Sequence, residues 1–483
     1  MDAGHRCHLD RLLRRCRFLR ETVSVVAAAI LCVCVLGGCV SEVPEVSPPV
    51  SMPQEFSSGG EGQLVDEWWR AFNDASLNRL VDHALGNSFE LKIAWDRLAQ
   101  AEAIARRTGA ALKPQVDLSA SARRTRERKN DNTDYTNKYL LGLPASYEVD
   151  LWGRLASQQQ AALLDAQASR EDVAAAAISL TARIAQTWYQ LAEAQQQISV
   201  ITAQIETNKE VLDGIDRRTG MGQTGLADLL RQKQFVISGY GQLILARERV
   251  DSLKNQLAVL VGLPPNSQSL DMDGELVDLP AMPLLPLPAE LIHRRPDVHS
   301  AYRDVQAADR RLAAAIAEKF PRISLSANLE TSGSRTRDLF DNWLASLAGN
   351  LAQPLLDGDR ISAEIERNRA VLSEVINAYG QAILTSLREV EDALVQEKRQ
   401  REYLDNLDEQ LKAAKAVRER TEASYVQGQL DYLRMLDSQV SLQSLERSCV
   451  TAKRELIELR IDLCRAIAGS WEIDRPEQAN LEQ

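Results

Sequence analysis

Four segments of the chain alternate apolar with polar residues. They cover residues 116–122, 139–149, 323–329 and 343–351. Alternation with a period of two is typical of a β-strand that has one apolar face. Strands of about 9–11 residues with this pattern suit a transmembrane β-barrel, although one such segment alone would fit a soluble hairpin better. Closure of a barrel needs about eight strands or more, so a barrel built from these four would have to be shared between subunits.

The polar stretches between the paired strands are expected to be loops. They cover residues 123–134, which are rich in charge, and residues 331–342. In a membrane barrel, polar loops of this kind project into water. We therefore expect both loops to face the outside of the cell.

Very long helices are predicted after each pair of strands. Residues 154–213 and 360–427 contain no proline and would span about 90 Å and 100 Å. In the second segment, apolar residues repeat every seven positions in a stripe that Glu397 and Gln400 interrupt. Such a stripe indicates a coiled coil. A plain soluble coiled coil would explain the helices but would leave the alternating strands unexplained.

The chain contains two copies of one unit. Pro114 and Pro321 lie in matching segments 207 positions apart, and the offset from Arg154 to Arg360 is 206. Each copy is predicted to run helix, two strands, very long helix, turn, helix. We expect repeat 1 over residues 76–269, with strands 115–123 and 138–150 and helices 154–213 and 226–262. A proline-rich linker at 270–296 leads to repeat 2 over 297–470, with strands 322–331 and 343–353, helices 360–427 and 430–469, and a tail at 471–483.

The N-terminus has the layout of a secretory signal peptide. Six arginines and three acidic residues lie in residues 1–22, and an apolar run of 14 residues follows at 23–36. This run is shorter than the ~20 residues of a spanning helix. It ends in Gly37-Gly38-Cys39, which resembles the lipobox of bacterial lipoproteins. We expect residues 1–38 to be a signal peptide and residues 39–75 a segment lipidated at Cys39; the alternative is an ordinary signal peptide with a chance cysteine.

Charge and cysteine usage narrow the function. The whole chain has a net charge of −11, which disfavours nucleic acid as a partner. Beyond residue 39 only Cys449 and Cys464 remain, 15 positions apart in one predicted helix. That spacing corresponds to about 22 Å of helical rise, too far for a disulfide, so two free and packed thiols are predicted. The histidines show no zinc-ligand spacing, so no metal is expected.

No catalytic constellation is recognisable. Residues 220–225 fit the dinucleotide-binding pattern G-x-G-x-x-G, but a long helix rather than a strand precedes them. Gly222 and its counterpart Gly428 are therefore predicted to mark turns between helices. With no nucleophile–base pair or phosphate loop, the chain is not expected to be an enzyme, and its one non-protein group would be the covalent lipid on Cys39.

Five strings in order resemble one known family. They are WWRAFNDASL at 68–77, YEVDLWGR at 147–154, RPDV at 295–298, FPRISL at 320–325 and QPLLDGDR at 353–360. Together they resemble the TolC-like outer-membrane factors, in the lipoprotein branch typified by NodT and OprM, over nearly all of the mature chain. The resemblance implies a mixed, mainly α fold that assembles as a homotrimer. Its twelve-stranded β-barrel crosses the outer membrane and is continued by an α-helical barrel through the periplasm.

The same resemblance implies the function and the partners. The chain would be a passive exit duct for small toxic compounds or drugs, working with a periplasmic adaptor and an inner-membrane pump. A duct for protein secretion is an alternative within the class. A periplasmic coiled-coil adaptor that never spans a membrane is an alternative outside it.

The resemblance also implies a gate at the periplasmic tip. Asp437 falls on the position of a pore-facing aspartate, and Asp228 and Tyr425 fall on positions that resemble a latch between neighbouring helix pairs. Arg434 departs from the pattern, because some members carry an acid there. Arg434 and Asp437 lie three apart on one helix and can pair, which would weaken an acidic ring. The alternative is that Asp437 and Asp228 are ordinary solvated helix positions.

Overall fold

The computed structural model describes residues 48–59, 66–129, 132–265 and 273–469, and residues 471, 473 and 475. The predicted signal peptide and Cys39 lie outside these residues, as does most of the predicted tail. The chain divides into two compact units, and each unit draws on both repeats. Among the described residues, the first unit holds Ala111–Ser157 and Ala313–Ile361, and the second unit holds the rest.

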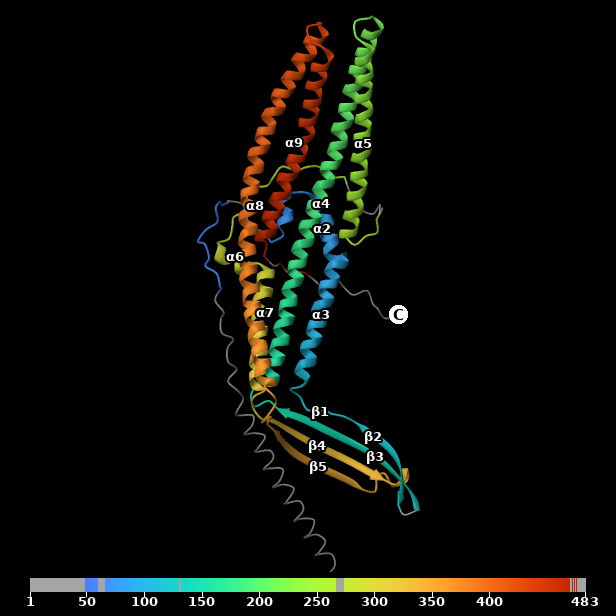
Figure 1. Cartoon of the computed structure of the whole chain (residues 1–483), viewed down its shortest axis with the longest axis vertical. Coiled ribbons are helices and arrows are strands. Elements are labelled where there is room, and N and C mark those ends of the chain that lie inside the picture. The colour runs from blue at the N-terminus through green and yellow to red at the C-terminus, as the bar shows by residue number, and fades with distance from the viewer. Residues whose placement is uncertain are drawn as a thin grey trace, which may run out of the picture. The chain divides into compact units, whose positions relative to one another are not determined.

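The first unit is an antiparallel sheet. Its strands are β1 (Gln115–Val116), β2 (Ser119–Lys129), β3 (Asn132–Val149), β4 (Arg322–Gly333) and β5 (Trp343–Ala352). β1 and β2 continue one register along the same edge of β3, and β4 and β5 follow on its other side (Figure 1). The pairing of β3 with β4, in which Ala145 faces Ala327, joins the two repeats into one sheet.

The expectation of a charged loop at residues 123–134 is wrong. Residues from Arg123 to Lys129 belong to β2, and each pairs with a residue of β3, ending at Lys129 opposite Asn132. The backbone pairing of a strand can continue where its side chains are charged, so the loss of apolar residues at Arg123 did not mark the end of the strand. The second connection does contain a loop, with a short helix, η2 (Thr336–Asp338), between β4 and β5.

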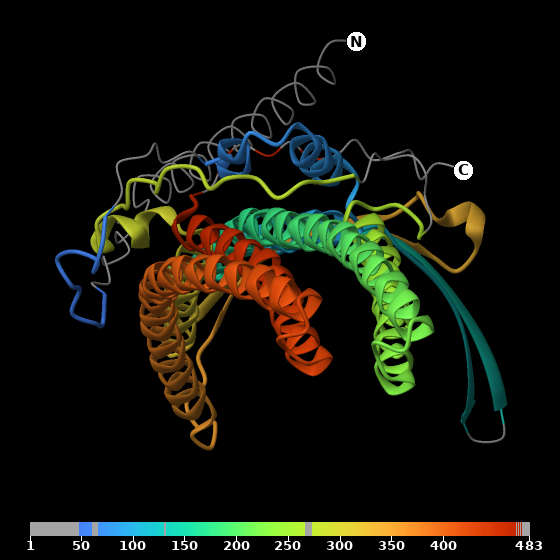
Figure 2. The same cartoon turned by 90° about the horizontal axis from the view of Figure 1, so that it is seen from above.

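The second unit is helical. Its helices are η1 (Trp68–Phe72), α2 (Ala75–Asn87), α3 (Phe89–Ala110), α4 (Arg154–Gly220), α5 (Leu226–Leu260), α6 (Pro288–Arg294), α7 (Pro296–Ala317), α8 (Arg360–Val426) and α9 (Tyr432–Ile467). Helices α4 and α5 form one long hairpin, and α8 and α9 form the other (Figure 1). Seen along their axes, α9 lies between α8 and α4 (Figure 2). None of the helices in the described ranges is long and apolar enough to cross a membrane.

The two longest helices begin in the same way. The Asp150 carboxylate accepts hydrogen bonds from the backbone N–H groups of Leu155 and Ala156, at 3.0 and 2.7 Å. In the second repeat the Asp357 carboxylate accepts from the N–H of Ile361 at 3.1 Å. A carboxylate at this position satisfies donors that have no partner inside the helix. This local chemistry explains why α4 and α8 begin at Arg154 and Arg360, as the repeat predicted.

The apolar core of the second unit gathers around the N-terminal segment. Trp69 is fully buried, and the Phe72 ring packs against Tyr189 of α4 with centroids 5.8 Å apart. Asp74 caps α2 through one carboxylate oxygen and accepts a hydrogen bond from Trp188 Nε1 at 2.7 Å through the other. Cys449 and Cys464 are both buried and free, which confirms the prediction of two packed thiols.

Candidate functional site

The sheet has one apolar face. Residues that pair across antiparallel strands share a face, and three rows across β3, β4 and β5 are almost wholly apolar. They are Leu143–Leu329–Ala345, Ala145–Ala327–Leu347 and Tyr147–Leu325–Gly349. Leu347 at the middle of β5 is 73% exposed. So large an exposed apolar surface requires a partner. The alternation of apolar and polar residues along each strand is that of a barrel strand whose apolar face contacts lipid.

Aromatic residues lie towards both ends of this sheet. Tyr139 of β3 and Trp343 at the start of β5 lie at the end where β2 turns into β3. At the other end Trp152 and Phe320 stack with centroids 4.8 Å apart. Trp and Tyr concentrate at the two interfaces of transmembrane barrels, because their rings are apolar and their edges are polar.

The opposite face of the sheet is polar. Its rows include Pro144–Asn328–Ser346, Ser146–Ser326–Ala348 and Glu148–Ser324–Asn350. Asn350 donates a hydrogen bond to Ser326 Oγ across this face at 3.4 Å. Alternation of an apolar and a polar face along each strand is the pattern of a membrane barrel whose inside is wet.

Both outer edges of the sheet are open. Within the part of the chain that the structure describes, β5 pairs with β4 alone, and β1 and β2 pair with β3 alone. Each edge therefore presents a row of unpaired backbone N–H and C=O groups. Such groups bind another strand readily, and in lipid each unsatisfied group is costly.

The two helical hairpins turn with the same geometry. Gly222 has φ +73° and Gly428 has φ +74°, a left-handed conformation that glycine adopts without a Cβ clash. In the first turn, Gly222 N–H donates to Thr219 O and Gln223 N–H to Arg218 O, both at 2.9 Å. The second turn repeats these bonds from Gly428 to Tyr425 O and from Gln429 to Ser424 O, also at 2.9 Å. This pair of backbone hydrogen bonds is the Schellman cap of a helix C-terminus.

A small cluster near the turns joins the two hairpins. Tyr432 Oη donates to Gln232 Oε1 at 2.7 Å, and Gln232 in turn donates to the carbonyl oxygen of Asn208 at 2.8 Å. The Tyr425 and Tyr432 rings meet edge to face with centroids 6.3 Å apart. Burial raises the pKa of Tyr432, and the nearby Asp228 carboxylate raises it further.

Arg218 also belongs to this cluster. Its guanidinium lies over the Tyr425 ring, 4.9 Å from the centroid, and donates to the carbonyl oxygen of Val426 at 3.3 Å. A cation over an aromatic face contributes about 0.5–2 kcal/mol, depending on exposure. The end of α4 is thus held to the end of α8.

The residues predicted for the gate take separate places. Arg434 and Asp437 are both exposed on α9, and no ion pair joins them in the part of the chain that the structure describes. Arg434 instead donates its backbone N–H to Asp431, the N-cap of α9, at 2.9 Å. Asp228 is half-buried in the first turn of α5. Tyr425 is buried, and its Oη has no hydrogen-bond partner among the described residues.

The sequence did not indicate the residues that join the hairpins inside one chain. Besides Gln232 and Tyr432, Asn208 and Gln443 form a buried, reciprocal amide pair, at 3.3 and 2.9 Å. One signal was available, because each of these amides lies on the buried side of a long helix, where apolar residues are usual. No signal in the sequence marked Arg218.

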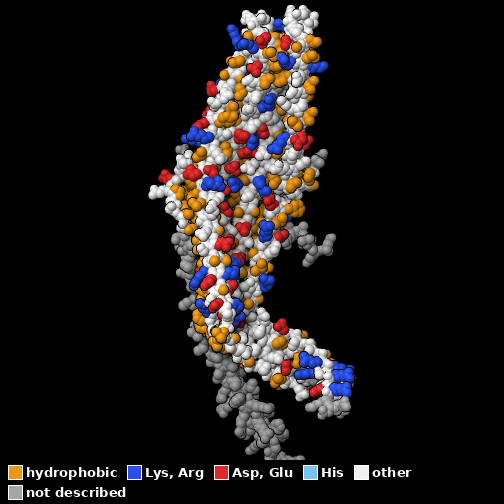
Figure 3. Space-filling view, viewed as in Figure 1, with side chains coloured by type: hydrophobic (Ala, Val, Ile, Leu, Met, Phe, Trp, Pro, Cys, Tyr) orange, Lys and Arg blue, Asp and Glu red, His pale blue; other side chains and the backbone are white. Residues whose placement is uncertain are grey.

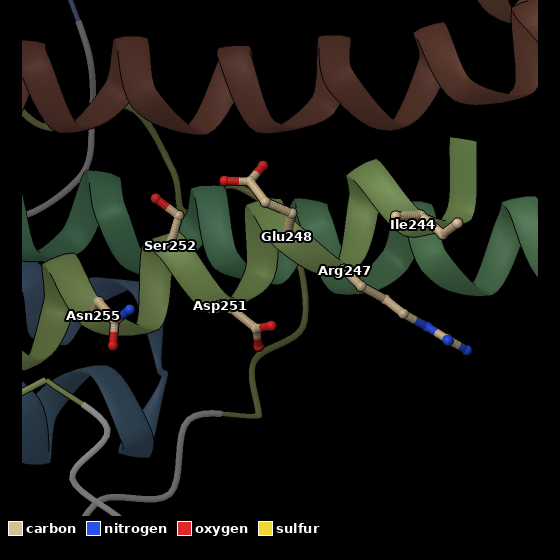
Figure 4. Close-up of a pocket in the computed structure, with 6 residues that line it drawn as sticks. All are labelled: Ile244, Arg247, Glu248, Asp251, Ser252 and Asn255. Carbon is tan, nitrogen blue, oxygen red and sulfur yellow. The ribbon is translucent and has the colours of Figure 1, made fainter. Parts of the chain in front are cut away.

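The other surface features do not form a catalytic site. A shallow groove on α5 is lined by Ile244, Arg247, Glu248, Asp251, Ser252 and Asn255. These side chains project from a single helix in different directions and do not converge on a common point (Figure 4). Across the described residues, no three His, Cys, Asp or Glu side chains are placed to hold a metal ion.

Comparison with known proteins agrees with this geometry. The chain is 28% identical over 478 residues to the pyoverdine export outer membrane protein OpmQ of Pseudomonas aeruginosa, covering 94% of this chain and 98% of that protein. It is 25% identical over 454 residues to nodulation protein T of Rhizobium leguminosarum, covering 92% and 93%. The solved outer-membrane channel OprN has the same fold, with a TM-score of 0.83 and 24% identity over 89% of this chain and 99% of that one.

The family described as "Outer membrane efflux protein" matches twice, over residues 80–263 and 287–469. The resemblance to TolC-like factors of the NodT type is thereby confirmed, as is the fold class of two tandem repeats. The chain belongs to the outer membrane efflux protein family.

Proposed function

We propose that three copies of this outer-membrane efflux protein close into one barrel and form the exit duct of a tripartite pump. One observation carries the proposal: a sheet of four long strands, apolar on one face and polar on the other, has both edges unpaired within the described residues. The edge at β5 would pair with the edge at β1 and β2 of the next copy, so that no backbone group stays unpaired in lipid. Three such sheets give twelve strands, within the range known for closed barrels.

The duct is proposed to be passive. Its inner wall would be the polar face, with Ser326, Asn328 and Ser346, which supports a water-filled passage rather than a shaped binding pocket. An inner-membrane pump, reached through a periplasmic adaptor, would then select the cargo. Relatives are named for different cargoes, such as pyoverdine for OpmQ and solvent for SrpC of Pseudomonas putida. We propose small toxic compounds or drugs as the cargo of this chain, with secreted protein as the alternative.

The apolar face separates this function from that of a periplasmic adaptor. Leu347→Arg places a charge at the middle of β5 on that face, and a charge facing lipid at mid-bilayer costs about 2–4 kcal/mol. Ser346→Arg, one residue away, places the same charge on the polar face. We expect Leu347→Arg to reduce the heat-modifiable trimer on gels and Ser346→Arg to keep the trimer and alter conductance. Equal yields of trimer would contradict the membrane assignment, and a monomeric mass in detergent would contradict the trimer.

We also propose a closed constriction at the helix turns. Three copies of Asp437 would approach one axis, and Arg434 would offset part of their negative field. Asp228 and Tyr425 would form the latch between neighbouring helix pairs. Two observations support this: Tyr425 Oη is buried without a partner in the described chain, and Asp228 keeps part of its surface exposed.

The last part of the proposal is the anchor. Cys39 would be acylated after removal of residues 1–38, because it follows a short apolar run and two glycines. A tagged fatty acid should label the wild-type protein and leave Cys39→Ser unlabelled. Equal labelling of both proteins would refute acylation at this residue.

A further inference from the structure

A row of arginines extends the apolar face beyond its aromatic end. Arg124, Arg126 and Arg128 alternate along β2, so their side chains share one face. They pair with Asn137, Tyr135 and Thr133 of β3 and are all exposed. Figure 3 shows Lys and Arg side chains gathered at this end of the sheet. In a chain of net charge −11, so dense a basic row needs a physical reason.

The pairing places these arginines on the lipid-facing side of the sheet. On the same face of the β2–β3 pair, Ala120 lies opposite Leu141 and Ala122 lies opposite Tyr139. Along β2 this face changes from apolar to basic side chains at Arg124. Towards the opposite end it continues through Leu143 and Ala145. Along this face, an apolar band is therefore followed by aromatic side chains and then by guanidinium groups. This is the order in which a lipid presents its acyl chains and its headgroup.

The Tyr135 ring lies close to two of these guanidinium groups. The Arg124 guanidinium lies 5.0 Å from the centroid of this ring, and that of Arg126 lies 5.8 Å from it. Stacking on an aromatic face restrains arginine while leaving its N–H donors available. Paired guanidinium groups match phosphate oxygens with two parallel hydrogen bonds each.

An apolar groove lies on the same face. It has a volume of about 540 Å³ and is lined chiefly by Leu118, Leu141, Leu143, Leu329, Phe340 and Trp343. Leu141 is four residues along β3 from Asn137, the partner of Arg124, which corresponds to about 14 Å of strand. A lipid can bridge that distance with its acyl chain in the groove and its phosphate at the arginines. Neither a free anion nor a nucleic acid would use both parts.

We infer that this face binds a phosphorylated lipid of the outer leaflet, the lipid A portion of lipopolysaccharide. Its phosphate groups bind Arg124 and Arg126, with Arg128 next in the row, and one acyl chain occupies the groove. The inference rests on the proposed function, because it needs the β2–β3 turn to face outside the cell. It adds a specific lipid contact to a barrel that otherwise needs only apolar surroundings.

The test uses the full-length protein purified in detergent and titrated with bis-phosphorylated lipid A. Arg124→Gln with Arg126→Gln removes two positive charges from the lipid-facing row. Arg123→Gln with Lys138→Gln removes two from the opposite face of the same hairpin, where these residues pair with each other. We expect the first variant to bind lipid A at least about tenfold more weakly and the second to bind within about twofold of wild type. Inorganic phosphate at the same concentration should not displace the lipid.

Three results would overturn the inference. They are unchanged affinity in the first variant, equal losses in both variants, and displacement of lipid A by inorganic phosphate, which would indicate a simple anion site. The heat-modifiable trimer, run on the same samples, shows whether each variant is assembled. Conductance in planar bilayers distinguishes failure of lipid A binding from failure of the proposed duct. A conducting protein that ignores lipid A refutes only this inference, whereas a protein that forms no channel refutes the proposed duct.

Discussion

Arg460 of α9 and Glu397 of α8 form a buried, bidentate ion pair. Arg460 Nη2 and Nε donate to the two carboxylate oxygens at 2.6 and 2.8 Å, and both side chains are at most 1% exposed. Arg460 Nη1 also donates to the carbonyl oxygens of Pro280 and Ala281, at 2.6 and 3.1 Å. The pair thus joins two long helices to the proline-rich linker. It explains why an acid interrupts the heptad stripe of α8.

Breaking this ion pair on one side should destabilise the protein. Glu397→Leu leaves the Arg460 charge buried without its carboxylate, which costs about 3–5 kcal/mol. The double variant Glu397→Leu with Arg460→Met should recover most of that loss, apart from the linker carbonyls that it leaves unpaired. Denaturant unfolding of the detergent-solubilised protein measures both. Equal losses in the single and double variants would show that the ion pair does not act as a unit.

The hairpin turns should depend on their glycines. Gly222→Ala or Gly428→Ala forces a Cβ into a left-handed conformation, at a cost of about 1–2 kcal/mol. Gly220→Ala is the matched control, because Gly220 ends α4 with open space around it and alanine favours helix. Amide hydrogen exchange should quicken in the last turns of α4 or α8 for the first two variants and not for the control. Quicker exchange in all three would show that any side chain disturbs the turn.

The residues at the tip should act on conductance in distinguishable ways. Tyr425→Phe with Asp228→Ala should raise single-channel conductance by loosening the latch, and Asp437→Ala should chiefly lower cation preference. The structure adds Arg218→Gln, which removes the contact with the Tyr425 ring and should also raise conductance. The exposed neighbour Arg217→Gln is its control. Wild-type conductance and selectivity in every variant would place the constriction elsewhere.

Burial makes the Cys464 thiol unreactive. It also makes the stability of the folded protein depend on pH in the alkaline range. Burial raises its pKa to about 12 from an ordinary value near 9. The folded state holds this proton more tightly, so its contribution to stability is complete below about pH 9. That contribution falls between about pH 9 and pH 12, by about 1 kcal/mol per pH unit. The stability difference between wild type and Cys464→Ala should therefore shrink as pH rises from 8 to 11; a constant difference would contradict this.

Orientation in the membrane can be read from intact cells. The buried native thiols give a low background, so Ser334→Cys in the loop after β4 should react with an impermeant maleimide. Gln223→Cys, in the turn between α4 and α5, should stay unlabelled until the outer membrane is opened. The reverse pattern would mean that the strand loops face the periplasm.

Local chemistry was readable in the sequence, and pairing between distant segments was not. Asp150 ahead of Arg154 sets the start of α4 by contacts within a few residues, so that start followed from residue type. The end of α4 was predicted too early, because the helix continues past residue 213 to Gly220, just before the turn at Gly222. The Tyr432–Gln232 bond joins residues 200 positions apart, and no local pattern specifies it. The prediction of a loop at residues 123–129 failed for another reason. Their register comes from the hydrogen-bond ladder with β3, which continues regardless of whether the side chains are apolar.

The two hairpin turns share a backbone geometry and differ in sequence, and this has a consequence for docking. Arg217 and Arg218 precede one turn, whereas Ala423 and Ser424 hold the matching positions before the other. In a ring of three chains, the six hairpin turns would then alternate between two kinds of surface residue. The backbone of the ring would have pseudo-sixfold symmetry, and its surface would have only threefold symmetry. A hexameric partner would meet two quasi-equivalent sets of three sites. Its subunits would bind with two affinities rather than one.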